Sequence, residues 1–543
     1  MKHQQKKSKT SFRIMYSNYK TIIRRLVITL LACGLLTTCD SISDFGNMNQ
    51  DPTRANTVKP GMLFSTVQLA AAGTRYEVWR TQLIYGENIA QQLVDAFYSG
   101  GNNYTENMDW LTAFWTTAYS GNGNPDRAQV KNIESLINIL KQKKDEGDQV
   151  ANKMAAARIM RAFIYSRITD LYGDAPYSEA GKGAINQEFT PKYDRQKDIY
   201  NDMFNELDAA VKQFDSSQPT YGSQDLMYGG EITKWEKFGN SLRLRLALRL
   251  VKVNPQKAKN EALAAINAPG GVMTSNEDIA MIKHQNGPSS GPAGLNTNAI
   301  SEAMLDGGDH EYVAQTLVDW MKNRNDPRLG IYAENGKPFL GFPSGYTSTS
   351  VTNHSSYTGN LSDYSRVNPM LINKDDPTFF QTYAEVEFMQ AELAVRGWTN
   401  ESAKNHYDAG VRAAMKYLSL YDAKGGADIS DSEVNTYLSN NPYNASGTDA
   451  EKIEQINTQY WAAVFLNGIE AWSNWRRSGY PDLEPALVDS NNPPPSNQTN
   501  GKIPRRLMYP QGTEGILNAK NYQEVIDRQG ENNMVTRVWW DTK

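Results

Sequence analysis

The two cysteines of this 543-residue chain, Cys33 and Cys39, both lie near the N-terminus. Everything after residue 39 therefore lacks a thiol, so the fold can use neither a disulfide nor a cysteine-bound metal. Its stability has to come from the burial of ordinary apolar side chains, which a chain of this length can supply. We therefore expect long, regularly patterned segments that pack against one another.

The segment that ends at these cysteines has the composition of an export signal. Basic residues up to Arg24-Arg25 precede an apolar run from Leu26, and the run ends in Leu36-Thr37-Thr38-Cys39. This order resembles a bacterial lipoprotein signal peptide, in which the cysteine is lipidated and becomes the first residue of the mature protein. The run is shorter than the roughly 20 apolar residues that span a bilayer, so the sequence predicts a lipid anchor at Cys39.

Two features of this leader leave alternatives open. Leu30-Leu31-Ala32-Cys33 is a second match to the lipidation pattern, but cleavage there would leave Leu35-Leu36 where a polar tether is expected. Met15 is an alternative start to Met1. We expect residues 1–38 to be the signal peptide, residues 39–60 a lipidated tether, and residues 61–543 one ligand-binding domain.

Charge and histidine content argue against two classes of function. After residue 38 the chain has 48 basic and 60 acidic residues, a formal net charge of −12, which disfavours nucleic acid as a partner. Because a chain this acidic is not attracted to anionic lipids, we expect the acyl chains to be its membrane anchor. The four remaining histidines, His284, His310, His354 and His406, form no paired metal-binding motif, so a zinc hydrolase is not expected.

Apolar residues recur with helical spacing along most of the chain. The spacing predicts helices at residues 62–73, 77–96, 128–144, 151–172, 196–214, 234–252, 312–323, 377–396, 401–418 and 450–477. Leu242–Leu246 also alternates like a strand, but Leu, Arg and Ala favour the helix. Small residues within 384–394 and 403–414 let two helices approach closely, as in a tetratricopeptide-type pair. The predicted fold class is all-α.

Long loops rich in Gly, Asn, Ser, Pro and Tyr separate the predicted helices. They cover residues 97–127, 173–195, 215–233, 268–311, 330–376, 422–449 and 480–524. Their many aromatic residues are untypical of disordered segments, and long loops inside a domain are often functional. The sequence therefore predicts an ordered, loop-built face on a helical scaffold.

Two of these loops carry the residues that we expect to bind a ligand. Flat aromatic rings match the apolar C–H faces of sugars, and polar groups at the rim can bond the hydroxyls. The candidates are Tyr98, Tyr104, Trp110, Trp115 and Tyr119 in the first loop, and Phe342, Tyr346 and Tyr357 in the second. The spacing of Trp110, Phe114 and Trp115 is also that of a buried helix face, so core packing stays open as their role.

Other motifs fit structural roles better than catalytic ones. Gly287-Pro288-Ser289-Ser290-Gly291 matches the pattern around a serine nucleophile, but it lies in a proline-flanked loop with no preceding strand. Asp170, Asp174 and Glu179 suit capping and turns better than the paired carboxylates of a glycosidase. Asp306-Gly307-Gly308-Asp309 and Asp375-Asp376 lack EF-hand spacing, although a structural calcium ion stays open. We expect no catalytic residue and no cofactor.

Nine segments, in their order along the chain, resemble one known family. They are Ala155–Phe163, Asp170–Tyr177, Trp235–Arg245, Asn325–Leu329, Glu385–Glu392, Gly468–Trp472, Trp475–Pro481, Ile503–Arg506 and Trp539–Asp541. Together with the leader they resemble the SusD/RagB-type nutrient-binding outer-membrane lipoproteins, over nearly all of the chain after the signal peptide.

The resemblance implies an all-α protein in which tetratricopeptide-like helix pairs support a loop-rich ligand-binding face. It also implies a lipid-anchored protein at the cell surface, without enzymatic activity. Such a protein binds a glycan and passes it to a SusC-like TonB-dependent transporter of the outer membrane, which it covers as a hinged lid. A peptide- or protein-binding lid of the same fold, and a surface glycosidase, stay open as alternatives. Binding residues vary in this family, so none is carried over.

Replacing Cys39 by serine should abolish lipidation, because the serine hydroxyl cannot take the place of the thiol that carries the lipid. We expect metabolic labelling with palmitate to mark the wild type and not Cys39→Ser. Cys33→Ser is the matched control and should label like the wild type. Labelling of Cys39→Ser together with loss of label in Cys33→Ser would move the anchor to Cys33.

Overall fold

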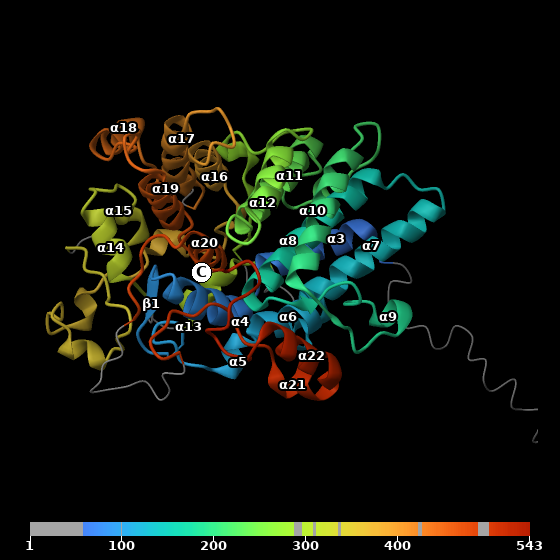
Figure 1. Cartoon of the computed structure of the whole chain (residues 1–543), viewed down its shortest axis with the longest axis horizontal. Helices are drawn as coiled ribbons and strands as arrows, with labels where there is room; N and C mark the ends of the chain where they lie inside the picture. Colours follow the sequence, from blue (N-terminus) through green and yellow to red (C-terminus); the bar gives the residue numbers. More distant parts are fainter. Residues whose placement is uncertain are drawn as a thin grey trace, which may run out of the picture. The chain divides into compact units, whose positions relative to one another are not determined.

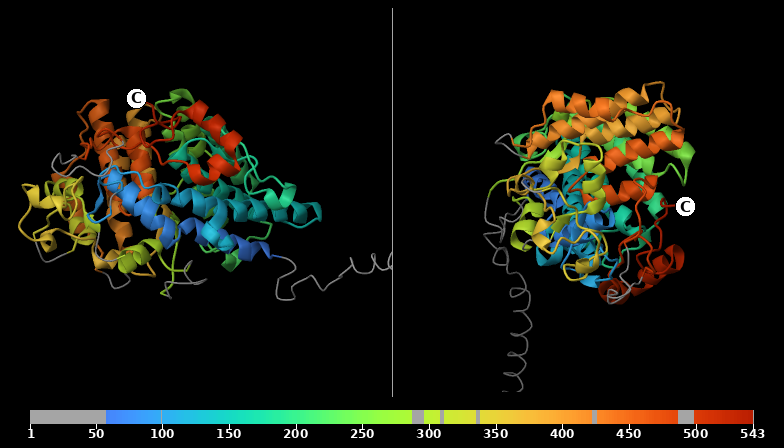
Figure 2. Two further views of the ribbon diagram at one scale, coloured as in Figure 1. Left: turned by 90° about the horizontal axis from the view of Figure 1, so that it is seen from below. Right: turned by 90° about the vertical axis from the view of Figure 1, so that its left-hand side faces the viewer.

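The structure is a computed structural model that describes residues 58–98, 100–286, 296–307, 311–334, 338–421, 426–486 and 499–542. The chain divides into two units, Met1–Val58 and Lys59–Lys543, and the fold below is that of the second unit (Figures 1 and 2). The predicted signal peptide and both cysteines lie outside the described residues.

Helices make up most of this unit. They are α3 (Pro60–Ala72), α4 (Arg75–Glu77), the π-helix η2 (Val78–Glu87), α5 (Met108–Leu111), α6 (Ala113–Ser120), α7 (Gln129–Asp145), α8 (Ala151–Tyr172), α9 (Gly183–Asn186), α10 (Gln196–Gln213), α11 (Ile232–Arg249), α12 (Pro255–Ile266), α13 (Ala299–Gly307), α14 (Gln315–Lys322), α15 (Leu329–Tyr332), α16 (Tyr383–Val395), α17 (Ala403–Lys416), α18 (Asp431–Asn440), α19 (Asp449–Ala463), α20 (Gly468–Ser478), α21 (Gln511–Leu517) and α22 (Ala519–Gln529). The strands are β1 (Leu93–Asp95), β2 (Ala175–Pro176), β3 (Tyr193–Asp194), β4 (Ala280–Ile282), β5 (Glu311–Val313) and β6 (Thr378–Gln381).

Helices that follow one another along the chain pack side by side. In the first half α7 packs on α8, α8 on α10, α10 on α11 and α11 on α12, and in the second half α16 packs on both α17 and α19 (Figure 1). The strands form three antiparallel pairs, β1 with β5, β2 with β3 and β4 with β6. The prediction of an all-α fold built from helix pairs is confirmed.

Helix α8 illustrates how local sequence sets these boundaries. It occupies the predicted residues 151–172, and most of its side chains are buried. Gly173 ends it with a φ of +92°, where a Cβ atom would lie 2.2 Å from the side chain of Gln529. Glycine adopts this backbone conformation without steric cost. The helical prediction for Leu242–Leu246 is also confirmed, because these residues lie inside α11.

The predicted helical hairpin of the second half is formed by α16 and α17. Gly410 allows the close approach, since a Cβ atom there would lie 2.7 Å from the ring of Phe388. The prediction that α16 begins near residue 377 is wrong. Residues 378–381 form β6, and Thr382 starts the helix through a reciprocal capping box with Glu385.

Two other predicted helices are interrupted by tertiary structure. The segment 77–96 leaves the helix after Ile89 and continues into β1, which pairs with the distant strand β5. The segment 450–477 is split into α19 and α20 at Leu466, whose φ is +67°. Helices α13 and α18 lie in segments that were predicted to be loops.

A network of buried charges joins four helices at the centre of the unit. Arg249 of α11 binds Asp170 of α8 at 3.2 Å and Glu470 of α20 at 2.6 Å, and Arg245 of α11 binds Glu385 of α16 at 2.6 Å. None of these five side chains is more than 7% exposed. Burial lowers the pKa of Arg249, but Glu470 and Asp170 outweigh it and raise that pKa above its ordinary value. Buried ion pairs therefore connect these four helices inside the core.

A second buried pair connects α16 to α20. Arg477 Nη1 lies 2.8 Å from both carboxylate oxygens of Glu392, and Arg396 contacts the same carboxylate at 2.7 Å. Glu392 is fully buried. Burial would raise its pKa, but Arg477 and Arg396 lower that pKa from 4.5 to about 2.

Replacing Glu392 by glutamine should destabilise the protein, because the charge of Arg477 would remain buried without its counter-charge. We expect the free energy of unfolding at pH 7 to fall by about 3–5 kcal/mol in urea denaturation. The folded-state pKa lies below the unfolded one, so the stability from this carboxylate is present above pH 4.5 and is lost as the pH falls towards 2. The free energies of unfolding of wild type and Glu392→Gln should therefore converge as the pH falls over that range.

The exposed pair Lys404–Asp408 provides the control for this measurement. Asp408→Asn should cost less than about 1 kcal/mol, because an exposed ion pair contributes little. If Glu392→Gln and Asp408→Asn lowered the free energy of unfolding equally, burial would not be the reason for the stabilising effect of Glu392.

Candidate functional site

The eight predicted ligand residues divide into two groups by burial. Tyr104, Trp115 and Phe342 are at most 3% exposed. Partly exposed side chains are those of Tyr98, Trp110, Tyr119, Tyr346 and Tyr357. Only the second group can offer a ring face to a ligand at the surface.

The three buried rings pack in the core. Trp115 is surrounded by aromatic rings, with ring centroids 5.2 Å from Tyr172 and 5.5 Å from Tyr509. The hydroxyl of Tyr104 accepts a hydrogen bond from the backbone N–H of Ala486 at 2.8 Å. Phe342 stacks on Tyr312 at 4.7 Å. Core packing, the alternative that the sequence left open for Trp115, is what the structure shows.

Tyr98 and Trp110 meet at the surface together with Trp79, a residue that the sequence analysis missed. The centroid of the Tyr98 ring lies 5.2 Å from Trp79 and 5.8 Å from Trp110, both nearly perpendicular, and the two tryptophan rings are 6.1 Å apart. All three side chains are partly exposed. We call Trp79, Tyr98 and Trp110 the aromatic platform.

Arg80 adds a cation beside the platform. Its guanidinium lies 4.0 Å from the ring centroid of Tyr76 and 4.8 Å from that of Trp79, and it donates to the backbone oxygen of Tyr76 at 3.0 Å. Burial lowers the pKa of Arg80, while Tyr76 and Asp109 act to raise it. The guanidinium lies over two rings, an arrangement that stabilises cations.

Hydrogen bonds from the core hold the platform loops in place. The carboxylate of Asp95 accepts from the N–H groups of Phe97 at 2.9 Å and Tyr98 at 2.8 Å, which fixes the turn after β1. The hydroxyl of Tyr85, inside η2, donates to the backbone oxygen of Thr105 at 2.8 Å and accepts from Asn107 N–H at 3.2 Å. These bonds fix the backbone at Tyr98 and just ahead of Trp110.

The second aromatic loop lies beside the first. Asn102 bridges them, because its amide nitrogen donates to the backbone oxygen of Tyr346 and its amide oxygen accepts from Gly345 N–H, each at 2.7 Å. Ser348 N–H also donates to Ala96 O at 2.8 Å. The structure thus brings together two segments about 240 residues apart in sequence, consistent with the predicted loop-built face.

Tyr346 and Tyr357 belong to a small core of their own in this second loop. They pack, partly exposed, against a buried cluster of Val94, Ala96, Tyr312, Ala314, Phe342, Val351 and Tyr364. Tyr346 also makes an edge contact with His354 at 4.8 Å. Burial lowers the pKa of His354, which favours the neutral imidazole.

Tyr119 and Trp320 lie apart from the platform trio. The hydroxyl of Tyr119 donates to Pro176 O at 2.7 Å, and its ring packs on Trp115. Trp320, which the sequence analysis also missed, borders a cavity of about 530 Å³ under the guanidinium of Arg324, 4.6 Å away.

The three carboxylates considered for glycosidase chemistry are engaged in structural contacts. Asp170 belongs to the buried charge network described above. Asp174 accepts from Gln196 N–H at 2.7 Å and pairs with Arg528 at 2.7 Å, and Glu179 accepts from Lys192 N–H at 3.0 Å. Asp174 and Glu179 therefore have turn roles, whereas Asp170 joins helices.

Several other sequence motifs lie wholly or partly outside the described residues. These are Gly287–Gly291, Asp309 and His310. Asp376, from the second acidic cluster, accepts from Asn373 N–H at 2.7 Å in a turn. Among the residues that the structure describes, no group of three or more His, Cys, Asp or Glu side chains could hold a metal ion.

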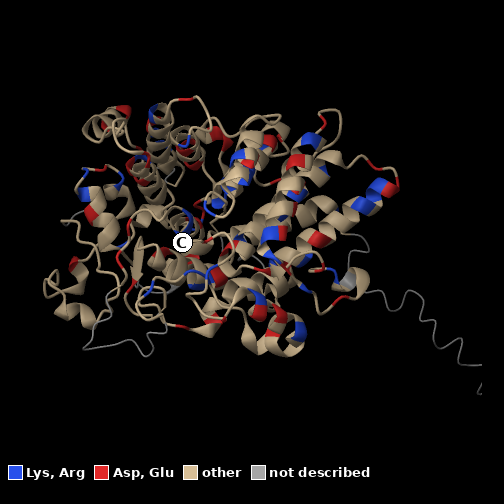
Figure 3. Ribbon diagram, viewed as in Figure 1, with Lys and Arg blue, Asp and Glu red and all other residues tan. Residues whose placement is uncertain are grey.

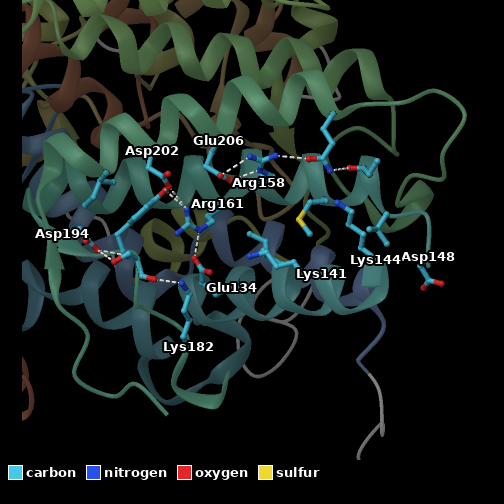
Figure 4. Close-up of a pocket in the computed structure, with 18 of the residues that line it drawn as sticks. Glu134, Lys141, Lys144, Asp148, Arg158, Arg161, Lys182, Asp194, Asp202 and Glu206 are labelled. Atoms are coloured by element: carbon cyan, nitrogen blue, oxygen red, sulfur yellow. Dashed lines mark hydrogen bonds and ion pairs between the residues drawn. The ribbon is translucent and has the colours of Figure 1, made fainter. Parts of the chain in front are cut away.

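A groove of about 1040 Å³ lies on other elements, between α7 and α10 over α8 (Figure 4). Charged side chains line it, and two arginines on its floor are already paired. Arg158 pairs with Glu206 at 2.8 Å, and Arg161 pairs with Glu134 at 2.5 Å. It has none of the aromatic platform residues on its walls.

Comparison with known proteins identifies the family. The SusD-like family described as starch-binding and associating with the outer membrane matches residues 52–510. The chain belongs to this family. SusD-like proteins are thus characterised by carbohydrate binding and by association with the outer membrane. None of the helices in the described part of this SusD-like chain is long and apolar enough to cross a membrane.

Solved structures of SusD-like proteins resemble the chain over most of its length. One named as a chitin-binding protein is 32% identical, with a TM-score of 0.77, and covers 89% of this chain and 100% of its own. A SusD homologue from Bacteroides uniformis is 27% identical, with a TM-score of 0.74 and coverage of 89% and 99%. A chitin-binding SusD homologue from Flavobacterium johnsoniae is 26% identical, with a TM-score of 0.70 and coverage of 89% and 98%. Among curated proteins, no match was found.

Replacing Asp95 by asparagine should preserve the platform turn and remove a pH dependence. Burial raises the pKa of Asp95 from 3.8 to about 6, against the two backbone hydrogen bonds that lower it. This acid binds its proton more tightly in the folded state. As the pH rises from 3.8 to about 6, the free energy of unfolding of the wild type should therefore fall by roughly 2–3 kcal/mol relative to that of Asp95→Asn. Urea denaturation at a series of pH values measures the difference.

Asp95→Ala is the companion variant. It removes the acceptor for Phe97 and Tyr98, so its free energy of unfolding should be lower than that of Asp95→Asn by about 1–3 kcal/mol at every pH. A constant difference between wild type and Asp95→Asn across the range would show that Asp95 does not titrate in this way.

Proposed function

We propose that this SusD-like protein binds a neutral glycan at the cell surface on the aromatic platform. The observation that carries the proposal is the cluster of three partly exposed rings, Trp79, Tyr98 and Trp110, in a chain of a carbohydrate-binding family. The rings come from η2, the turn after β1 and α5, so the cluster exists only in the folded protein.

The chemistry of the platform suits saccharides. Sugar rings present apolar C–H faces that pack on aromatic rings, and binding sites add a few polar groups that fix orientation. Asn107 and Asp109 lie in the same segment as Trp110, and Arg80 lies against Trp79. These groups can bond sugar hydroxyls and carbonyls around an apolar contact.

Chitin-type oligosaccharides are the first ligands to test. Two of the similar solved structures are named as chitin-binding. We propose an oligomer of N-acetylglucosamine for this chain on that basis. Starch-type oligomers are the natural comparison, because the family description names starch.

Binding is proposed as one step of uptake. The lipid on Cys39 would hold the protein at the outer membrane, and the glycan would pass to a SusC-like TonB-dependent transporter. The sequence pattern around Cys39 and the family's association with the outer membrane support this part of the proposal.

Replacing Trp79 or Trp110 by alanine should weaken glycan binding at least about tenfold, because each removes a ring face from the platform. Isothermal titration of a soluble protein starting at Ser41 with N-acetylglucosamine and glucose oligomers measures the effect. Trp398→Ala is the matched control, since Trp398 is also partly exposed but lies in the turn after α16.

Thermal unfolding of each variant separates lost binding from lost folding. If folded Trp79→Ala and Trp110→Ala proteins bound the glycan as tightly as the wild type, the aromatic platform would not be the binding site. Binding by wild type to neither oligomer series would reject the proposed ligand class.

A further inference from the structure

A small polar cavity lies beside the buried charge network. Its volume is about 50 Å³, more than the roughly 10–15 Å³ that one water molecule needs. Residues of α8, α11, β6, α16 and α20 line it. The cavity is therefore formed by elements that come together only in the folded protein, and it has room for a small ion.

Two arginines line this cavity. Arg167 of α8 is partly accessible, and its one hydrogen bond to a described residue runs from Nη1 to the backbone oxygen of Ala71 at 2.8 Å. Arg245 is 6% exposed and lies on α11, whose basic residues are blue in Figure 3. Its Nε atom makes no hydrogen bond with a described residue, although Glu470 lies 3.6 Å away. Both side chains thus keep unused donors beside the cavity.

The two carboxylates on the cavity wall are paired with other arginines. Glu385 binds Arg245 at 2.6 Å, and Glu470 binds Arg249 at 2.6 Å. Arg167 makes no ion pair within 4 Å in the part of the chain that the structure describes. Its positive charge is therefore the one on the wall that lacks a direct partner.

Glu77 is a third carboxylate that acts on Arg167, but only from a distance. It accepts from the hydroxyl of Thr74 at 3.0 Å and from the amide of Gln129 at 3.2 Å. Burial raises the pKa of Glu77 from 4.5 to about 7, so it is only partly ionised at neutral pH. Burial also lowers the pKa of Arg167 to about 10, against the effect of Glu77. Arg167 therefore stays charged at neutral pH with an incomplete counter-charge.

A neutral donor and a helix end also border the cavity. Tyr421 is 9% exposed, and its hydroxyl makes no hydrogen bond with a described residue. Asn467 is the N-cap of α20, but its side chain caps none of the N–H groups of that helix. Free N–H groups at a helix N-terminus favour an anion. Phe379 and Phe465 add apolar walls, which strengthen electrostatic attraction inside the cavity.

We propose that this cavity binds one small monovalent anion, such as chloride, beside the guanidinium of Arg167. The anion supplies the counter-charge that Glu77 provides only in part, and Tyr421 donates to it. A cavity of this size accepts a halide ion and excludes an organic anion as large as gluconate.

Thermal unfolding in two sodium salts of equal ionic strength tests the proposal on the soluble protein that starts at Ser41. We expect the melting temperature of the wild type to rise by at least about 1 °C when about 200 mM gluconate is replaced by chloride. The rise should saturate, because an anion that binds only the folded state stabilises it by mass action. Bromide should act like chloride. Equal ionic strength removes general screening as a cause.

Arg167→Met is the variant for this measurement. Methionine keeps an unbranched side chain against the rings of Phe114 and Phe163 but removes the charge. Its melting temperature should be the same in chloride and gluconate. Arg412→Met is the matched control, since the side chain of Arg412 is 43% exposed on α17, away from the cavity, and this variant should respond like the wild type.

Bromide in crystals of the wild type gives a second test that does not require the variant to fold. We expect an anomalous-scattering peak beside the guanidinium of Arg167. Four outcomes would overturn the proposal. They are equal melting temperatures of the wild type in the two salts, an undiminished chloride response in Arg167→Met, an equal loss of the response in Arg412→Met, and no bromide peak in the cavity. The proposal does not depend on the glycan site.

Discussion

The fold depends on charges that are buried where the helices cross. Arg249 links α11 to both α8 and α20, and the indole N–H of Trp540, close to the C-terminus, donates to the same Asp170 at 2.9 Å. A buried charge that loses its partner is strongly destabilising, so each helix of this group needs the others in place. The network thus makes segments that are hundreds of residues apart in sequence fold as one cooperative unit, although the core contains no disulfide.

The platform is connected to this centre through α20. A Cβ atom on Gly86 of η2 would lie 2.7 Å from the backbone of Gly468, the first residue of α20, so the two helices touch through their main chains. Gln82 of η2 also donates to Leu466 O at 3.3 Å. Trp79 is carried by this anchored helix, whereas Tyr98 is held by Asp95. Rings fixed before a ligand arrives cost less ordering on binding.

Long helices could be predicted from the sequence because their signal is local. Helix α8 has its boundary at Gly173, and the hairpin of α16 and α17 has small residues such as Gly410 at the contact. Strand β1 could not be predicted, because its three residues are defined by pairing with β5 more than 200 residues away. Tertiary contacts also decide the different burial of Trp110 and Trp115. They lie five residues apart in one aromatic segment, yet one is partly exposed and the other packs against Tyr172 and Tyr509.

Net charge limits which glycans the aromatic platform can bind. After residue 38 the chain has a formal net charge of −12, which opposes polyanionic glycans at long range. A neutral sugar on aromatic rings is unaffected by that field, because its contacts are apolar or uncharged hydrogen bonds. An acidic protein can therefore select neutral saccharides on this face without attracting polyanions to it.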